Sequence, residues 1–329
     1  MERDQVEAIV SQVLGRLQKG DAPRAEMPAK PRGAFKTVSE AVSAARSAQQ
    51  TLIALPLEKR REIIASIRRR AAEDVVNLAK LANEETKLGR VEDKIKKNLL
   101  VIHKTPGPEI LEPIAWTGDD GMTLLERAPY GVISSITPCT NPTETILCNG
   151  IGMVSGGNTV VFNTHPTAKG VSAYVIDLIN RAAMEVGGPE NLMTCIASPT
   201  IDSANELLRF PGIRLNVVTG GPAVVKAAMN AGKKAICGGP GNPPVVVDET
   251  ADLAQAARGI VKGASFDNNI ICTDEKEVFA VEKIFDKLME GLEQNGAVRL
   301  RNHQITRLEK LILTPDKEHT KGEWVGKNA

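Results

Sequence analysis

The fold is constrained most by an alternation of short apolar runs with helical patterns that begins at Tyr130. The runs expected to form strands are 131–137, 159–163, 192–197, 215–219 and 244–248. The segments with helical periodicity are 142–155, 167–186, 201–209, 223–231 and 251–264. This order predicts an α/β fold with a mostly parallel sheet wrapped by helices. Sheets of this kind bind ligands at the carboxyl ends of their strands.

The chain before Tyr130 has a different character. Residues 37–102 are helical in pattern, and we interpret their many charges as solvated helix faces. Asp120-Gly121 predicts a hairpin turn, followed by an edge strand over 123–128. Residues 1–19 carry an apolar stripe at helical spacing, and the Pro- and Ala-rich segment 20–34 is typical of a linker. That helix either docks on its own domain or binds a groove in a partner.

Composition excludes several classes of function. The net charge is +1 and aromatic residues make up 3% of the chain, which argues against nucleic-acid or membrane partners. Five cysteines occur without C-x-x-C or Cys/His ligand spacing, so we expect reduced thiols, no metal site and a cytoplasmic location. No apolar run is long enough to span a bilayer.

One cysteine stands in a setting that suits a reactive group. Cys272 lies in the polar loop of GASFDNNIICTDE, between a helical pattern and the strand-like run 277–282. Loops at element ends often present functional groups. The competing interpretation is a buried Cys that serves as a small apolar side chain.

Asn141 has two possible uses. It follows the strand 131–137 and precedes Pro142, with Glu144 three residues on, which is the pattern of a helix N-cap and capping box. Alternatively, its amide NH2 donates to a developing oxyanion. The geometry of this one amide decides between the two uses.

Two glycine pairs follow later strands. Gly220-Gly221 leads into a helix, whose first backbone N–H groups favour phosphate. Gly238-Gly239 belongs to a second glycine loop that permits close approach of a ligand or a catalytic loop. Ordinary turns between strands and helices explain both pairs equally well.

Five segments together resemble the aldehyde dehydrogenase superfamily, and more closely the CoA-acylating acetaldehyde and propionaldehyde dehydrogenases of bacterial microcompartments. The segments are ITPCTNPTET, GNTVVFNTHPTA, VTGGPAVVKAA, GGPGNPPVVVDETADL and GASFDNNIICTDEK. The resemblance implies a Rossmann-type dinucleotide-binding domain plus an α/β catalytic domain. It also implies NAD-dependent oxidation of a short aldehyde to acyl-CoA.

The resemblance assigns a role to each matching position. Cys272 matches the nucleophile, which forms a thiohemiacetal and then an acyl thioester, and Asn141 matches the oxyanion donor. NAD and coenzyme A share one groove in the family. The positions that match its cofactor side are Thr137, Pro138, His165, Pro166, Gly220, Gly221, Gly238 and Gly239. The sequence does not determine whether the enzyme prefers NAD or NADP. It also does not determine the chain length of the aldehyde.

One departure from the hydrolytic relatives bears on the reaction. Those enzymes carry a water-activating Glu two residues before the second Gly-Gly, and Ile236 stands there in this chain. No acidic residue occurs anywhere in 233–247. A thioester hydrolyses slowly unless water is deprotonated in place, so this segment favours transfer to CoA. A hydrolytic enzyme whose base comes from elsewhere is the alternative.

The family resemblance also suggests how the chain is divided. We expect an encapsulation helix at 1–19 that binds a microcompartment shell protein, a linker at 20–34, and 35–236 with the N-terminal helices, the oligomerisation hairpin and the dinucleotide-binding domain. Residues 237–329 then form a partial catalytic domain, since relatives continue beyond Ala329. The expected location is the microcompartment lumen, and the expected full-length form is a homo-oligomer. An inactive, C-terminally truncated cargo protein is the rival from a different class.

Overall fold

The computed structural model describes residues 15 and 28–328, which divide into two compact units. Among these residues, unit 1 comprises 28–86 and 94–239, and unit 2 comprises 87–93 and 240–328. The expected encapsulation helix and most of the linker lie outside the described residues. The division after Gly239 falls beside the predicted boundary between residues 236 and 237, and the four-part domain scheme itself stays a prediction.

Unit 1 is built on a parallel six-stranded sheet with the strand order β1-β6-β5-β4-β7-β8. Its strands are β1 (Ala34–Phe35), β4 (Val132–Ile136), β5 (Thr159–Asn163), β6 (Met193–Ile196), β7 (Ile213–Thr219) and β8 (Lys234–Gly238). Every residue of β4, β5 and β6 is buried, as in a parallel sheet covered on both faces. The predicted α/β fold with a parallel sheet is confirmed.

Two strands were not expected from the sequence. β1 has two residues, too few to show any periodicity. β8 includes Gly238, so the prediction that Gly238 belongs to a glycine loop is wrong. The segment nevertheless forms an edge strand because β7 offers it a ladder from Leu215 to Thr219.

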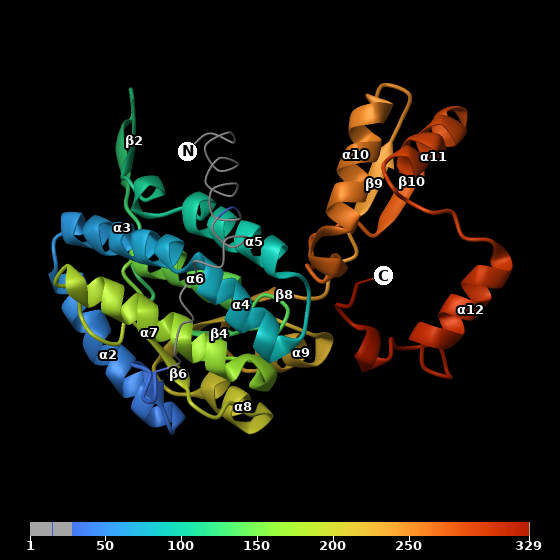
Figure 1. The fold of residues 1–329 in the computed structure, drawn as a ribbon. Helices are drawn as coiled ribbons and strands as arrows, with labels where there is room; N and C mark the ends of the chain where they lie inside the picture. Colours follow the sequence, from blue (N-terminus) through green and yellow to red (C-terminus); the bar gives the residue numbers. More distant parts are fainter. Residues whose placement is uncertain (1–14, 16–27, 329) are drawn as a thin grey trace. The chain divides into compact units, whose positions relative to one another are not determined.

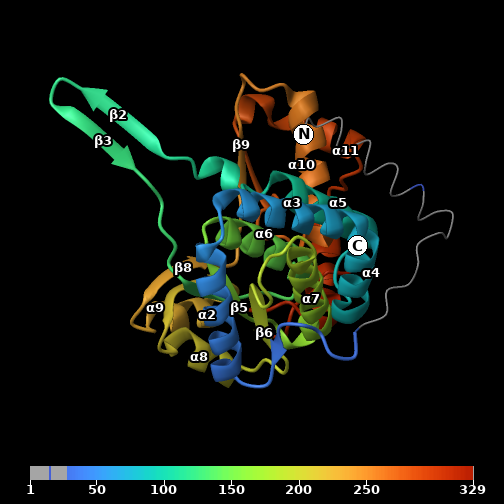
Figure 2. The ribbon, with the colours of Figure 1, turned by 90° about the vertical axis from the view of Figure 1, so that its left-hand side faces the viewer.

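Helices cover both faces of the sheet (Figures 1 and 2). On one face lie α6 (Pro142–Ser155) and α7 (Lys169–Glu185), with α3 (Leu57–Glu73) and α4 (Val75–Thr86) packed on them. On the other lie α2 (Val38–Ala54), α8 (Ile201–Arg209) and α9 (Pro222–Met229). The helix expected from residue 167 begins at Lys169, because the 3-10 turn Pro166–Ala168 precedes it.

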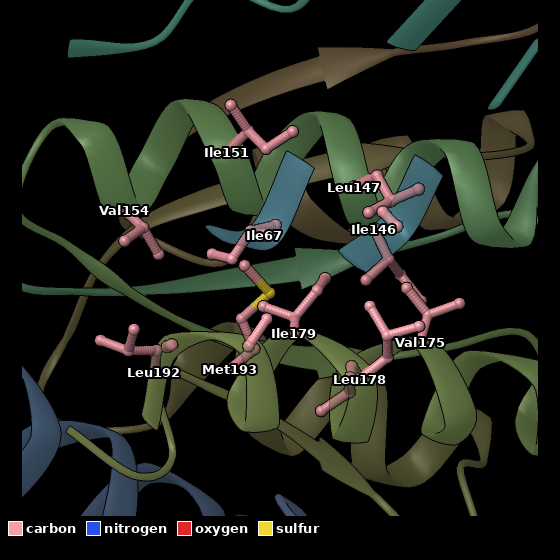
Figure 3. Packing of buried hydrophobic residues seen from close by; sticks show 14 of the residues in the cluster. Ile67, Ile146, Leu147, Ile151, Val154, Val175, Leu178, Ile179, Leu192 and Met193 are labelled. Carbon is pink, nitrogen blue, oxygen red and sulfur yellow. The ribbon is translucent and has the colours of Figure 1, made fainter. Parts of the chain in front are cut away.

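The larger core of unit 1 lies between α6, α7 and the sheet. Figure 3 shows Ile146 of α6 beside Val175 and Ile179 of α7, with Leu147 and Ile151 of α6 in the same cluster. All five side chains are fully buried. Since α6 begins directly after Asn141, this packing fixes the position of one candidate site residue.

A hairpin of β2 (Ile114–Gly118) and β3 (Gly121–Leu125) leaves the body of unit 1 (Figure 2). The turn predicted at Asp120-Gly121 is confirmed, while the following strand begins two residues earlier than expected. All residues of both strands are exposed, including Trp116 and Met122. No helix in the described part of the chain is long and apolar enough to cross a membrane.

Unit 2 is built around a parallel pair, β9 (Pro244–Val247) and β10 (Glu277–Ala280). The helices α10 (Leu253–Ala264) and α11 (Phe285–Gln294) pack together, and their small core comprises Val247, Ala257, Ile260, Ile284 and Leu288. The helix α12 (Asn302–Ile312) has no buried residue. The helix α5 (Val91–Lys104) spans the division, with residues 91–93 in unit 2. The remaining 3-10 turns are Pro108–Ile110, Phe266–Asn269, Glu282–Ile284 and Gly322–Trp324.

Candidate active site

Cys272 lies in a short loop of unit 2 between the 3-10 turn Phe266–Asn269 and β10. The side chain is exposed, so the interpretation as a buried apolar Cys is wrong. The loop closes on itself because the Asp274 carboxylate accepts from the backbone N–H of Ile271 (3.2 Å), and the Asp274 N–H donates to the Ile271 carbonyl (3.2 Å). Cys272 is therefore presented at the tip of a tight turn.

The turn before Cys272 has an unusual backbone. Asp267, Asn268 and Asn269 are three consecutive residues with positive φ angles of 45°, 57° and 57°. Asp and Asn adopt the left-handed region more readily than other residues with a side chain, but a run of three is costly. Such strain persists only where the surroundings enforce it, and it concentrates at functional sites.

Asp267 is one anchor of this strained run. Its carboxylate is fully buried and accepts a 2.6 Å hydrogen bond from the backbone N–H of Arg90. Its own N–H donates to Asp93 (3.1 Å), which also pairs with the Arg90 guanidinium at 2.6 Å. A buried set of backbone and side-chain hydrogen bonds thus fixes the start of the loop that carries Cys272.

Asn269 is the second anchor. Its amide NH2 donates to the carbonyls of Ala264 (2.7 Å) and Glu275 (3.2 Å), on either side of the loop. Its oxygen accepts from Lys276 Nζ (2.7 Å), which also donates to the Ile271 carbonyl (3.2 Å). This single side chain ties together both ends of the loop that carries Cys272.

Gly241 lies against the backbone of Cys272. A Cβ atom at position 241 would overlap with the Cys272 carbonyl oxygen, so only glycine fits. Beyond it, the Lys276 N–H donates to the Pro243 carbonyl (3.1 Å), just before β9 and β10 pair. The segment of Gly241 and the loop of Cys272 therefore lie in direct backbone contact.

The other four cysteines differ from Cys272 in burial. Cys195 is buried in β6, and burial raises the pKa of its thiol to about 12, which makes it unreactive. Cys139 and Cys237 are half-buried, and Cys148 is exposed within α6. Among all five, Cys272 alone combines exposure with a loop whose conformation is fixed by hydrogen bonds.

Asn141 lies in unit 1 at the start of α6, but it does not cap the helix. Its side chain makes no capping hydrogen bond, and the Glu144 carboxylate bonds elsewhere, so the predicted capping box is wrong. Instead the Asn141 Oδ1 atom accepts from Lys97 Nζ at 2.7 Å. The NH2 group makes one hydrogen bond to the neighbouring Thr140 hydroxyl (3.2 Å). This geometry excludes the use of Asn141 as a helix cap. It is compatible with the other use, in which the NH2 group donates to an oxyanion.

The residues matched to the cofactor side lie at the carboxyl ends of neighbouring strands. Thr137 and Pro138 follow β4, His165 and Pro166 follow β5, and Gly220 and Gly221 follow β7. Gly238 ends β8, and its carbonyl accepts from the Gly220 N–H (3.1 Å). The sheet therefore brings four of the sequence segments to one edge, as expected for a parallel α/β sheet.

Two observations show that this edge fits a polar ligand. The Thr137 hydroxyl is buried and has no hydrogen-bond partner among the described residues. Buried polar atoms rarely lack a partner in folded proteins, so such an atom suits a ligand group. At Gly221, Gly238 and Gly239 an added Cβ would meet nothing within 4 Å, which leaves space at the backbone.

His165 is positioned as a neutral hydrogen-bond donor at the same edge. Its Nδ1 atom accepts from the Thr167 N–H (3.3 Å) and lies 2.8 Å from the Thr167 hydroxyl, which places the ring hydrogen on Nε2. The side chain is exposed at the surface, yet desolvation on its protein side lowers the pKa of His165. The Nε2–H group can therefore donate to an oxygen of a ligand.

Ile236 lies in β8 and is 57% exposed. Neither it nor any other residue from 233 to 247 carries a carboxylate. The described residues also contain no group of three His, Cys, Asp or Glu that could hold a metal ion. Residues 233–247 thus offer no carboxylate to activate water.

The sequence did not indicate the residues that support the two proposed catalytic side chains. The charges of 37–102 were interpreted as solvated, but Lys94 and Lys97 are 0% and 6% exposed and Asp93 is 4% exposed. Helical periodicity gave no signal for this burial, because Lys94 and Lys97 lie on a different face of the helix from the apolar stripe of Ile95, Leu99 and Ile102. The supporting role of Asp267 had no local signal.

Comparison with known proteins places the chain among enzymes. The sequence pattern of the "Aldehyde dehydrogenase family" matches residues 24–304. The acetaldehyde dehydrogenase (acetylating) of Escherichia coli is 47% identical over 100% of this chain and 71% of its own length. The propanal dehydrogenase (CoA-propanoylating) of Salmonella typhimurium is 41% identical over 88% of this chain and 63% of its own length.

Solved structures agree with these relatives. A propionaldehyde dehydrogenase from the fucose utilisation microcompartment of Clostridium phytofermentans superposes with a TM-score of 0.86 at 44% identity, over 91% of this chain and 68% of that one. The Rhodopseudomonas palustris propionaldehyde dehydrogenase, with bound CoA and an acylated cysteine, gives 0.86 at 45% identity, over 90% and 68%. The chain belongs to the aldehyde dehydrogenase family, in the branch of the CoA-acylating acetaldehyde and propanal dehydrogenases.

Proposed function

We propose that this chain oxidises acetaldehyde or propanal to the acyl-CoA, with NAD as hydride acceptor and Cys272 as nucleophile. The balanced reaction is aldehyde + CoA + NAD⁺ giving acyl-CoA + NADH + H⁺. The observation that carries the proposal is an exposed Cys272 held on a strained, hydrogen-bonded turn. It occurs in a chain that is 47% identical to an acetylating acetaldehyde dehydrogenase.

The first step uses the sulfur of Cys272. The thiolate is the reactive form of cysteine, and its lone pair forms a C–S bond to the carbonyl carbon. The carbonyl electrons move onto the oxygen, where the Asn141 amide and the Cys272 backbone N–H stabilise the charge. When that charge collapses to a thioester, a hydride leaves the carbon, and a bound nicotinamide supplies the acceptor.

The second step transfers the acyl group from Cys272 to a thiol. A CoA thiol ionises more readily than water and attacks a thioester without a strong base. The absence of a carboxylate from 233 to 247 removes the group that would deprotonate water. We therefore propose transfer to CoA over hydrolysis. Release of free carboxylate from aldehyde and NAD at the same rate without CoA would support the hydrolytic alternative.

The cofactor side of the site is proposed to be the carboxyl edge of the sheet. The unpartnered Thr137 hydroxyl and the Nε2–H of His165 provide polar groups. The glycines Gly221, Gly238 and Gly239 leave room for close approach of a dinucleotide or of CoA. The remaining proposed positions on this edge are Pro138, Pro166 and Gly220.

The test compares two exposed cysteines. With acetaldehyde, NAD and CoA, Cys272→Ala should abolish acyl-CoA formation, while Cys148→Ala should retain it. Without CoA, mass spectrometry of digested protein should find the acyl group on the peptide that carries Cys272. An acyl group on the peptide with Cys139 or Cys148 would overturn the assignment of the nucleophile. A wild-type chain that forms no product would favour the inactive cargo protein.

We also propose that residues 1–19 direct the chain into the lumen of a bacterial microcompartment by binding a shell protein. The apolar stripe in this segment and the microcompartment origin of one similar structure support the proposal. Fusion of residues 1–20 to a fluorescent protein should bring it into shells, and Val10→Glu should abolish this by placing a charge in the stripe. Diffuse fluorescence of the unmodified fusion in shell-producing cells would contradict it.

A further inference from the structure

The oxygen of the Asn141 amide lies on a buried lysine. Lys97 Nζ donates to Asn141 Oδ1 at 2.7 Å and lies 3.4 Å from the Glu144 carboxylate. Lys97 is 6% exposed and Glu144 is 5% exposed. All three side chains belong to unit 1, since Lys97 lies on α5 and the other two lie at the start of α6.

Glu144 is itself held in place by two further side chains. Asn98 Nδ2 donates to Glu144 Oε1 (3.4 Å), and the Thr143 hydroxyl donates to Oε2 (3.0 Å). Asn98 is fully buried and also bonds to the Lys94 carbonyl (2.8 Å). The carboxylate therefore stabilises the buried ammonium from a fixed position.

Stability alone does not account for a buried ion pair of this kind. Two charges lose their hydration on burial, and apolar side chains of similar volume usually do as well or better. Retention of such a pair is easier to understand where the charge acts on a third group. Here the third group is the amide of Asn141.

The ammonium fixes the orientation of the Asn141 amide. Lysine is a donor without acceptor capacity, so it bonds to the amide oxygen and would repel the NH2 group if the amide were flipped. The NH2 group must then point away from Lys97. The positive charge of Lys97 beside the amide oxygen also draws electron density from the amide nitrogen. This makes the N–H groups of Asn141 stronger donors.

We propose that Lys97 is a positioning residue, which orients and polarises the Asn141 amide for the oxyanion, and that Glu144 holds Lys97 in place. This inference rests on the proposed oxyanion role of Asn141. Lys97 itself contacts neither substrate nor cofactor in this scheme. Its contribution is made entirely through the amide.

The experiment measures kcat/KM for acyl-CoA formation in a double-mutant cycle. Asn141→Ala should lower kcat/KM about 100-fold, as loss of an oxyanion donor does in other enzymes. Lys97→Met should lower it about 10-fold, mainly through kcat with the KM for NAD unchanged. The Lys97→Met/Asn141→Ala double variant should be no slower than Asn141→Ala, because Lys97 acts through that amide. Lys97→Gln, which can still donate to the amide oxygen, should recover part of the loss.

Two controls separate positioning from folding. Lys97→Met/Glu144→Leu replaces both partners of this ion pair with apolar side chains, so it should fold and still show the loss in kcat/KM. Lys80→Met changes a half-buried lysine on the neighbouring helix α4 and should retain wild-type kcat/KM.

The outcomes distinguish the inference from the proposed function. Wild-type kcat/KM in Asn141→Ala would overturn the oxyanion role and the inference with it. If Asn141→Ala lowers kcat/KM while Lys97→Met/Glu144→Leu keeps the wild-type value, the positioning role of Lys97 is overturned. The oxyanion role of Asn141 would then stand. Additive losses in the Lys97→Met/Asn141→Ala variant would also overturn it, because they would mean that Lys97 acts elsewhere.

Discussion

The segments around Asn141 and around Cys272 hold their side chains in place by different means. Asn141 precedes α6, a regular helix whose apolar face is packed into the larger core of unit 1. Cys272 follows three left-handed residues in unit 2, and hydrogen bonds from Asp267 and Asn269 fix that backbone. The five-residue core of unit 2 comes from β9, α10 and residues 284–288, outside the loop itself.

This difference has a consequence for how each region fails. A packed helix loses stability when a core side chain is shortened, and its backbone geometry changes little. A strained turn loses its conformation when a single hydrogen bond or a glycine is replaced, even where little apolar area is lost. We expect core substitutions to reduce the stability of unit 1, and polar or glycine substitutions to move Cys272.

The largest effect is expected in the core of unit 1. Phe162 in β5 is fully buried, and Phe162→Ala should lower the free energy of unfolding of unit 1 by about 4 kcal/mol through lost burial and a cavity. Hydrogen exchange of the β4 and β5 amides measures this loss. The protection of amides 263–276 in unit 2 serves as an internal reference. An equal loss of protection there would contradict the expectation that core substitutions weaken unit 1 alone.

The next effect is expected at a glycine beside the strained turn. Gly89 has a φ of +69°, and a Cβ there would overlap with the Asp267 carboxylate. Gly89→Ala should cost about 3 kcal/mol, from left-handed strain plus displacement of a buried carboxylate.

The matched control is Gly259→Ala, since Gly259 lies in α10 with open space around it. This control should stabilise by about 0.5–1 kcal/mol, because alanine favours a helix over glycine. Hydrogen exchange in unit 2 compares the two variants. Equal protection in both would show that the contact between Gly89 and Asp267 carries no strain.

A smaller effect should distinguish charge from hydrogen bonding at Asp267. Asp267→Ala leaves the Arg90 N–H buried without its acceptor, at a cost of about 2 kcal/mol. Asp267→Asn keeps an oxygen acceptor and tolerates the left-handed region, so the cost should be about half as large. The rate of alkylation of Cys272 by iodoacetamide should change more in Asp267→Ala. Identical behaviour of the two variants would mean that the charge is what matters.

The smallest effect concerns pH. Desolvation, and then the charge of Arg68, lower the pKa of His103, whose Nε2 atom is buried and has no hydrogen-bond partner among the described residues. A lowered pKa in the folded state favours the neutral ring, so its stabilising contribution is present above about pH 6.5 and is lost as pH falls below it. Solvent screening limits the change to roughly a few tenths of a kcal/mol. His103→Gln should flatten the dependence of unit 1 stability on pH below about 6.5. An unchanged slope would contradict this assignment.

The sheet was readable from the sequence because its central strands are fully apolar or small and alternate with amphipathic helices. The strands β4 and β5 and the helices α6 and α8 appear where the pattern indicates. The edge strand β8 was missed because Lys234 and Gly238 bracket only three less polar residues. Its pairing with β7 depends on a neighbour that local periodicity does not contain.

The candidate site was readable only in part. Cys272 and Asn141 were identified from the residues that surround them in the chain. Lys97 bonds to Asn141 from 44 positions away in the sequence, and Asp267 is held by the backbone N–H of Arg90, 177 positions away. Helical periodicity also gives no means to tell a buried lysine from a solvated one, since the difference is the carboxylate of Glu144 on another helix.

The register of β9 with β10 fixes the position of Cys272 relative to the segment that precedes β9. The first matched residues of the ladder are Pro244 and Glu277, and Thr273 to Lys276 separate Cys272 from that point. A residue added to or removed from this spacer would displace Cys272 from its close backbone contact with Gly241. Insertions and deletions should therefore be as poorly tolerated in this four-residue spacer as replacement of Asp274 or Lys276, whose side chains bond to the backbone of Ile271.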